Sequence, residues 1–159
     1  MANVLKWSAL GTFTTAIPGD AAAPTLKGLA NGARVLGDEI DNTGGRHTFS
    51  DWDLKLGGHG ASIWAVGGYL ELHFVPAVDG SVYADGDASV EALQNTLVGT
   101  FAIRNVSTAQ RLVVRRVLLP ATKFKPLILN RVDLAGVDGL TANNGDNVLS
   151  YRTYNFEAQ

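Results

Sequence analysis

The residues best placed to do chemistry in this chain are Glu71 and His73, two positions apart in an alternating segment. An extended strand would place both side chains on one face. A carboxylate beside an imidazole can move a proton or bind a metal ion. The same spacing is typical of the solvated polar face of a strand, which is the interpretation that an isolated pair favours. His47 and His59 lie in other segments and add no metal-ligand spacing.

Two segments rich in Asp and Asn raise the question of calcium binding. Residues 79–87 hold three carboxylates, and residues 138–146 have a similar composition. Neither matches the spacing of oxygen ligands in a calcium loop, which also requires a distal Glu. Asp and Asn side chains also bond to their own backbone in turns. Turn formation therefore explains both segments.

Four arginines form the only basic concentration in the sequence: Arg104, Arg111, Arg115 and Arg116. They could contact an acidic surface on a partner, or they could pair with Asp and Glu on adjacent strands. Both interpretations stay open at this stage.

The three tryptophans could form a platform on which sugars stack. Trp52 alternates with apolar residues, which favours a place in the core, and Trp64 carries no further signal. Trp7 lies in the atypical N-terminal stretch and could anchor an interface.

Sequence signatures of catalysis are missing. The chain has no Gly-x-Ser-x-Gly elbow and no phosphate loop that ends in Gly-Lys-Ser/Thr, and it contains no cysteine. Gly57, Gly58 and Gly60 are interpreted as a turn. We therefore expect a non-enzymatic protein without catalytic, cofactor-binding or metal-binding residues, and we expect no small-molecule substrate.

The elements that would position these residues are strands, because the dominant hydrophobic period is two. Leu70, Leu72 and Phe74 alternate with polar residues, as do Trp52, Leu54 and Leu56. Further strand-like runs cover residues 100–104, 111–119, 123–130 and 148–156. In the run 111–119 the adjacent Arg115 and Arg116 break the alternation, which predicts a β-bulge. Only residues 88–95 suggest a helix, of one or two turns, and residues 26–36 are ambiguous.

Asp-Gly and Asn-Gly turns separate about eight such runs, and proline stays at turns and run edges. This pattern predicts an all-β fold, namely an antiparallel two-sheet sandwich that is jelly-roll-like and has an extended N-terminal segment. Residues 1–24, rich in Ala, Gly, Thr and Pro, form an edge strand or an arm that reaches a neighbouring subunit. Residues 25–159 form the sandwich, with a single domain overall.

Length and charge narrow the class of protein. The chain has 159 residues, a formal net charge of −2 and 18% charged residues, against about 25% in an average protein. The charge balance argues against a nucleic-acid partner, and no apolar run is long enough for a membrane span. We also expect no signal peptide. A weakly charged surface is typical of a subunit buried in an assembly, but equally of a glycine-rich β-protein with many turns.

Several segments resemble a known group of proteins. The segments on which the resemblance rests are LKGLANGARVLGDEIDN (26–42), GYLELHFVPAVDGSVYADGD (68–87), LVGTFAIRNVSTAQRLVVRRVLLPATKFKPLILN (97–130) and NVLSYRTYN (147–155). Together they resemble small virion structural proteins of tailed bacteriophages, over residues 25 to 156. The shared motifs are strands and turns rather than catalytic signatures.

The resemblance implies a jelly-roll capsid decoration, or cement, protein. Such a protein would be made in the host cytoplasm and would sit on the capsid surface of the virion as a homotrimer. Its partners would be the major capsid protein and itself, and it would stabilise the expanded head by bridging capsid subunits. The alternative is a tail, baseplate or fibre-associated module that binds host-surface carbohydrate.

Overall fold

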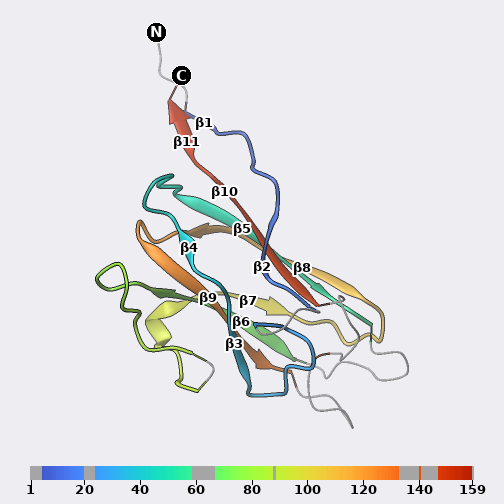
Figure 1. Ribbon diagram of the computed structural model, residues 1–159. Coiled ribbons are helices and arrows are strands. Elements are labelled where there is room, and N and C mark those ends of the chain that lie inside the picture. The colour runs from blue at the N-terminus through green and yellow to red at the C-terminus, as the bar shows by residue number, and fades with distance from the viewer. Residues whose placement is uncertain are drawn as a thin grey trace.

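A computed structural model describes residues 5–19, 24–58, 67–87, 89–132, 140 and 147–158. These residues form two antiparallel β-sheets that pack against each other, as the sequence predicts (Figure 1). Within them, no helix is long and apolar enough to cross a membrane.

The first sheet, called sheet I, contains four strands. In spatial order they are β2 (Thr14–Ile17), β10 (Val148–Tyr154), β5 (Phe49–Leu56) and β8 (Gln110–Leu118). The second sheet, called sheet II, contains five. These are β3 (Arg34–Leu36), β9 (Lys123–Arg131), β6 (Tyr69–Pro76) and β7 (Leu97–Ala102) in order, with the short β4 (Ile40–Asp41) also paired to β9.

The pairing of the strands is nested along the chain. The innermost pair is β6 with β7, followed outward by β5 with β8, β3 with β9, and β2 with β10. Outermost of all, β1 (Leu5–Trp7) pairs with β11 (Phe156–Ala158). The chain is therefore one long hairpin, and the contacts β5·β10 and β6·β9 roll it into two sheets. This is the jelly-roll-like arrangement that the sequence predicts.

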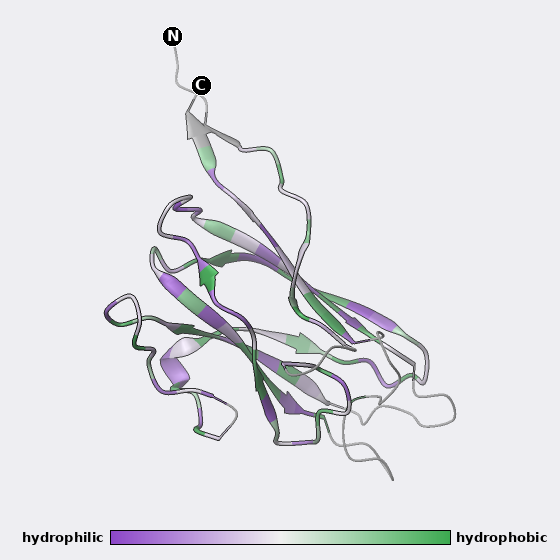
Figure 2. Ribbon diagram, viewed as in Figure 1, coloured by the Kyte–Doolittle hydropathy of each residue, from purple (hydrophilic) through white to green (hydrophobic). Residues whose placement is uncertain are grey.

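The core between the sheets follows the predicted alternation of side chains. Trp52 is fully buried, and its ring lies 5.2 Å from that of Phe74 on the opposite sheet. Phe74 also contacts Phe124 of the neighbouring strand of sheet II, with 4.7 Å between the ring centroids, so the aromatic cluster joins both sheets. The indole Nε1 of Trp52 donates to the Ser50 hydroxyl, which satisfies the one polar atom of that ring. Figure 2 shows hydrophilic and hydrophobic residues mixed along the strands.

The predicted bulge is confirmed at Arg115 and Arg116. The register of β8 against β5 shifts between Ser50 and Trp52, and Arg116 adopts a positive φ of 58°. The predicted helix of one or two turns is wrong for the described residues, where a single 3₁₀ turn, η1 (Gln94–Thr96), occurs at that place. The backbone N–H groups of Ser89 and Val90 instead donate to the Asp87 carboxylate in a turn, and this local bonding competes with helix formation.

Both ends of the described chain lie in a two-stranded ribbon. It begins in sheet I as β2·β10 and continues as β1·β11 beyond the sandwich (Figure 1). Bonds between Ser8 and Asn155 join the two halves of the ribbon. Of its apolar side chains, Leu10, Phe13 and Phe156 are exposed. Phe156 packs edge-on against Phe49 and Phe13 lies under Arg152, so the sandwich covers these two rings only in part.

Candidate functional site

The candidate site is the outer face of sheet I, where cationic side chains gather. We call it the basic face. Its charged residues are Asp51, Asp53 and Lys55 on β5, Arg111, Arg115 and Arg116 on β8, and Arg152 on β10. Five cations and two carboxylates give this face a net charge of +3, although the whole chain carries −2.

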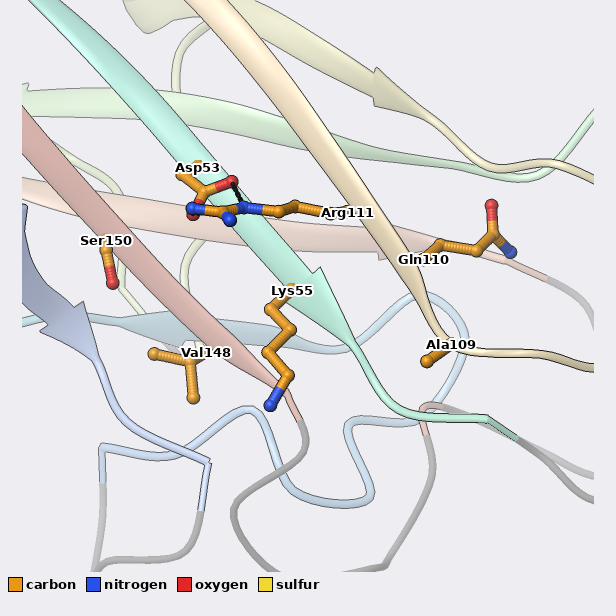
Figure 3. Close-up of a pocket in the computed structure, with 7 residues that line it drawn as sticks. All are labelled: Asp53, Lys55, Ala109, Gln110, Arg111, Val148 and Ser150. Carbon is orange, nitrogen blue, oxygen red and sulfur yellow. Dashed lines mark hydrogen bonds and ion pairs between the residues drawn. The ribbon is translucent and has the colours of Figure 1, made fainter.

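Asp53 and Arg111 form the first of two ion pairs on the basic face. The guanidinium donates from both Nε and Nη2 to the carboxylate, at 2.8 and 2.7 Å (Figure 3). Asp53 is buried, whereas the Arg111 side chain is 68% exposed. The hydrogen bond and the charge of Asp53 raise the pKa of Arg111. Because the pairing is bidentate, the guanidinium has a fixed orientation at the surface.

Asp51 forms the second and more buried ion pair. Its carboxylate accepts hydrogen bonds from the Arg152 guanidinium, the Tyr154 hydroxyl and the backbone N–H of Arg116. Burial alone raises the pKa of Asp51, but these hydrogen bonds outweigh burial, and the net pKa is lowered. Arg152 also lies over the Phe13 ring, with 4.9 Å to the centroid. Asp51 therefore ties β5, β8 and β10 together from the outside of the sheet.

The remaining cations of the face point outward. Lys55 and Arg115 are exposed, and neither forms an ion pair with a residue in the described part of the chain. The bulge places Arg115 and Arg116 side by side, next to the Asp51 cluster. Exposed apolar side chains, Val113 at 45% and Leu118 at 65%, lie on the same strand. Such a mixture of oriented arginines and apolar side chains can bind carboxylates on another protein.

The outer face of sheet II differs, because the chain covers it. Residues 77–93, called the acidic loop, connect β6 to η1 and contain four carboxylates and no Lys or Arg. Tyr83, Ala84 and Ala92 of the loop pack with Val75, Leu127 and Leu129 of the sheet in a second apolar cluster. Hydrogen bonds fix the loop as well. Tyr83 donates to Glu39, and this bond raises the pKa of Tyr83 to about 12.

The predicted pair Glu71 and His73 lies under this covering segment rather than on a solvated face. His73 is 5% exposed, and its Nε2 lies 3.5 Å from the Glu71 carboxylate. Thr96 donates its only hydroxyl hydrogen to the Leu93 carbonyl at 2.6 Å, so it must accept from Nδ1 of His73 at 3.0 Å. The pair thus holds η1 onto β6.

The first acidic segment forms turns, as predicted. The carboxylate of Asp79 accepts from the amides of Ser81 and Val82, and that of Asp87 from Ser89 and Val90. Within the described residues, no group of three or more His, Asp or Glu side chains could hold a metal ion. The second acidic segment, 138–146, lies outside the described residues except for Leu140, which is buried.

The remaining residues singled out from the sequence lie in the core, in a connection between strands, or outside the described residues. Trp52 is a core residue, as predicted, whereas His59, Gly60, Trp64 and the side chain of Trp7 lie outside what the structure describes. Arg104 lies in the connection between β7 and β8, where its backbone bonds to the Gln110 side chain. No pattern in the sequence points to Asp51 and Arg152, which are 101 positions apart and meet only through the pairing of β5 with β10.

Comparison of the chain with protein-family models, with curated proteins and with solved structures gives no match.

Proposed function

We propose that this protein is a non-enzymatic structural subunit that binds other protein subunits in an assembly. The observation that carries the proposal is the ribbon β1·β11, which extends beyond the sandwich, together with the exposed side chains near it: Phe156 in β11, and Leu10 and Phe13 in the segment between β1 and β2. A two-stranded ribbon on its own is marginally stable in water. Apolar side chains on such a ribbon gain stability when a neighbouring subunit covers them.

The proposed assembly is a bacteriophage capsid, because the sequence resembles small virion structural proteins over residues 25 to 156. In this role the protein is a capsid decoration, or cement, protein. It sits on the outside of the expanded head as a homotrimer and bridges subunits of the major capsid protein. The interface it adds stabilises the assembled state by mass action. No small molecule, cofactor, nucleic acid or membrane takes part.

The test is fractionation of the virions of the phage that encodes this chain. Heads and tails are separated, and mass spectrometry measures the copy number of the chain in each fraction. Hundreds of copies on heads are expected for a cement protein. A few copies confined to tails would overturn the capsid role and support a tail module that binds host carbohydrate. Absence from both fractions would overturn the virion location altogether.

A truncation tests the role of the ribbon. Deletion of residues 1–12 removes β1 but keeps β2, whose Ile17 is fully buried in the core. We expect this variant to keep a cooperative thermal transition and to lose binding to expanded capsids that lack the wild-type chain. Binding equal to that of the full chain would contradict a role for the ribbon.

A further inference from the structure

The basic face has an acidic counterpart on the same molecule. The acidic loop carries Asp79, Asp85, Asp87 and Glu91 and no cation, while the basic face carries a net +3. Glu91 pairs with Arg131 of β9 at 3.5 Å, so the three aspartates are the carboxylates open to a partner. The basic face is the outside of sheet I, and the loop covers the outside of sheet II (Figure 1). The core of the sandwich separates the two surfaces. Within one chain they cannot meet.

The two surfaces also match in their apolar side chains. Val78 is 75% and Val82 is 57% exposed at the tip of the acidic loop, beside the carboxylate of Asp79. On the basic face, Val113 and Leu118 are exposed between and beyond the arginines. Exposed apolar side chains within charged surfaces of opposite sign are typical of a protein interface.

We propose that the basic face binds the acidic loop of a second copy of this chain, in a head-to-tail contact. Because the contact joins two different surfaces, each copy keeps one of each surface free for the next copy. Repetition of the contact therefore produces a closed ring if the rotation between copies closes, and an open array if it does not. The proposal rests on the proposed function as an assembly subunit, and it names the surfaces through which copies meet.

The arrangement of the basic face favours a protein partner over a phosphate backbone. Asp51 and Asp53 lie among the arginines and engage Arg152 and Arg111. Their carboxylates would repel phosphates that track across the face. A protein loop with a few separated carboxylates can instead place each charge beside an exposed cation such as Arg115 or Lys55 and keep clear of the two aspartates.

A charge-swap experiment tests the contact. Arg115→Glu reverses a cation that has no ion pair among the described residues, and Asp85→Lys reverses an exposed carboxylate of the loop. Sedimentation velocity over a range of concentrations measures the self-association of the full chain. We expect each single variant to associate at least about tenfold more weakly than wild type, and R115E/D85K to recover most of the association. Wild-type association is expected to weaken between about 0.1 M and 0.5 M salt.

The controls separate this contact from general effects. Arg46→Glu makes the same change in net charge at an exposed position in the connection between β4 and β5, and should leave association unchanged. Thermal melts of all variants verify that the sandwich folds. A wild-type chain that stays monomeric at every concentration would overturn the proposal, as would single variants that associate like wild type or a double variant that fails to recover.

A second assay tests whether the basic face binds nucleic acid instead of protein. A fluorescent single-stranded oligonucleotide is titrated with wild type and with Arg115→Glu at about 0.1 M salt. We expect no binding that depends on Arg115, and binding lost in the variant would overturn the assignment to protein. A failed charge swap in a chain still found on capsid heads would reject only this contact and leave the proposed function standing.

Discussion

The outer faces of the two sheets differ in what stabilises them: apolar packing under a loop on sheet II, and ion pairs on sheet I. On sheet II, the chain places its own loop over Val75 and Leu129 and buries His73 beneath it. On sheet I, Leu10 and Phe13 border one end of the face, no loop like the acidic loop lies over the rest of it in the described chain, and two buried aspartates hold arginines at the surface. A face covered by its own chain gains stability from burial. A face held open by ion pairs stays available to a partner, which is why we place one side of the contact between copies on sheet I, opposite the acidic loop of the next copy.

The largest expected difference between the faces comes from truncating one apolar side chain on each. Leu129→Ala removes a buried side chain under the acidic loop and should lower the free energy of unfolding by about 2–4 kcal/mol. Val113→Ala, on the exposed face of sheet I, should change it by less than about 0.5 kcal/mol. Chemical denaturation measures both. Equal losses of unfolding free energy would show that both outer faces are buried alike and would contradict the difference drawn between them.

The second prediction concerns the ion pair that holds sheet I from outside. Asp51→Asn removes the charge that Arg152 and Tyr154 bond to, and should destabilise the protein by about 2 kcal/mol. Asp85→Asn, at an exposed carboxylate in the acidic loop, serves as the matched control and should change stability by less than about 0.5 kcal/mol. Urea denaturation at neutral pH gives both values. A stable D51N variant would show that Asp51 does not tie the strands.

The third prediction follows from the lowered pKa of Asp51. Since the folded protein favours the charged form, Asp51 contributes stability above its unfolded pKa of about 3.9. This contribution is lost as the pH falls through the lower, folded-state pKa. The stability difference between wild type and Asp51→Asn should therefore shrink steadily below about pH 4. A difference that stays constant down to pH 2 would contradict the assignment.

The smallest predicted effect is on the covering of sheet II. Thr96→Val removes the hydroxyl that accepts from His73 and donates to Leu93, and should cost about 1 kcal/mol. Hydrogen exchange of the amides in the acidic loop should become faster, because η1 is held less firmly. Thr100→Val, on the exposed side of β7, is the matched control and should leave exchange unchanged. Equal exchange in both variants would argue that the loop is held by apolar packing alone.

The sequence predicts the inner faces far better than the outer ones. The alternation around Trp52 and Phe74 identified the strands and the core, and the doublet Arg115–Arg116 located the bulge. These are local patterns, since burial repeats every second residue along a strand. They are enough to define a two-sheet sandwich.

The features that distinguish the outer faces depend on contacts between distant positions. Asp51 meets Arg152 only because β5 pairs with β10, and no pattern within either strand reveals that pairing. The burial of His73 likewise depends on how the acidic loop folds back over β6. For this reason the sequence alone favours a solvated strand face for His73. The ribbon β1·β11 joins the two ends of the chain, so its strands are also too far apart to be paired from local pattern.

The most direct test of the central claim, that the basic face is the surface buried on assembly, is covalent footprinting of arginines. The full chain is treated with an arginine-selective dicarbonyl reagent at low and at high concentration, and mass spectrometry measures the rate of modification at each site. We expect Arg115 to react several-fold more slowly at high concentration, while the exposed Arg46 reacts at the same rate in both. An unchanged rate at Arg115 in a sample that has assembled would contradict the account.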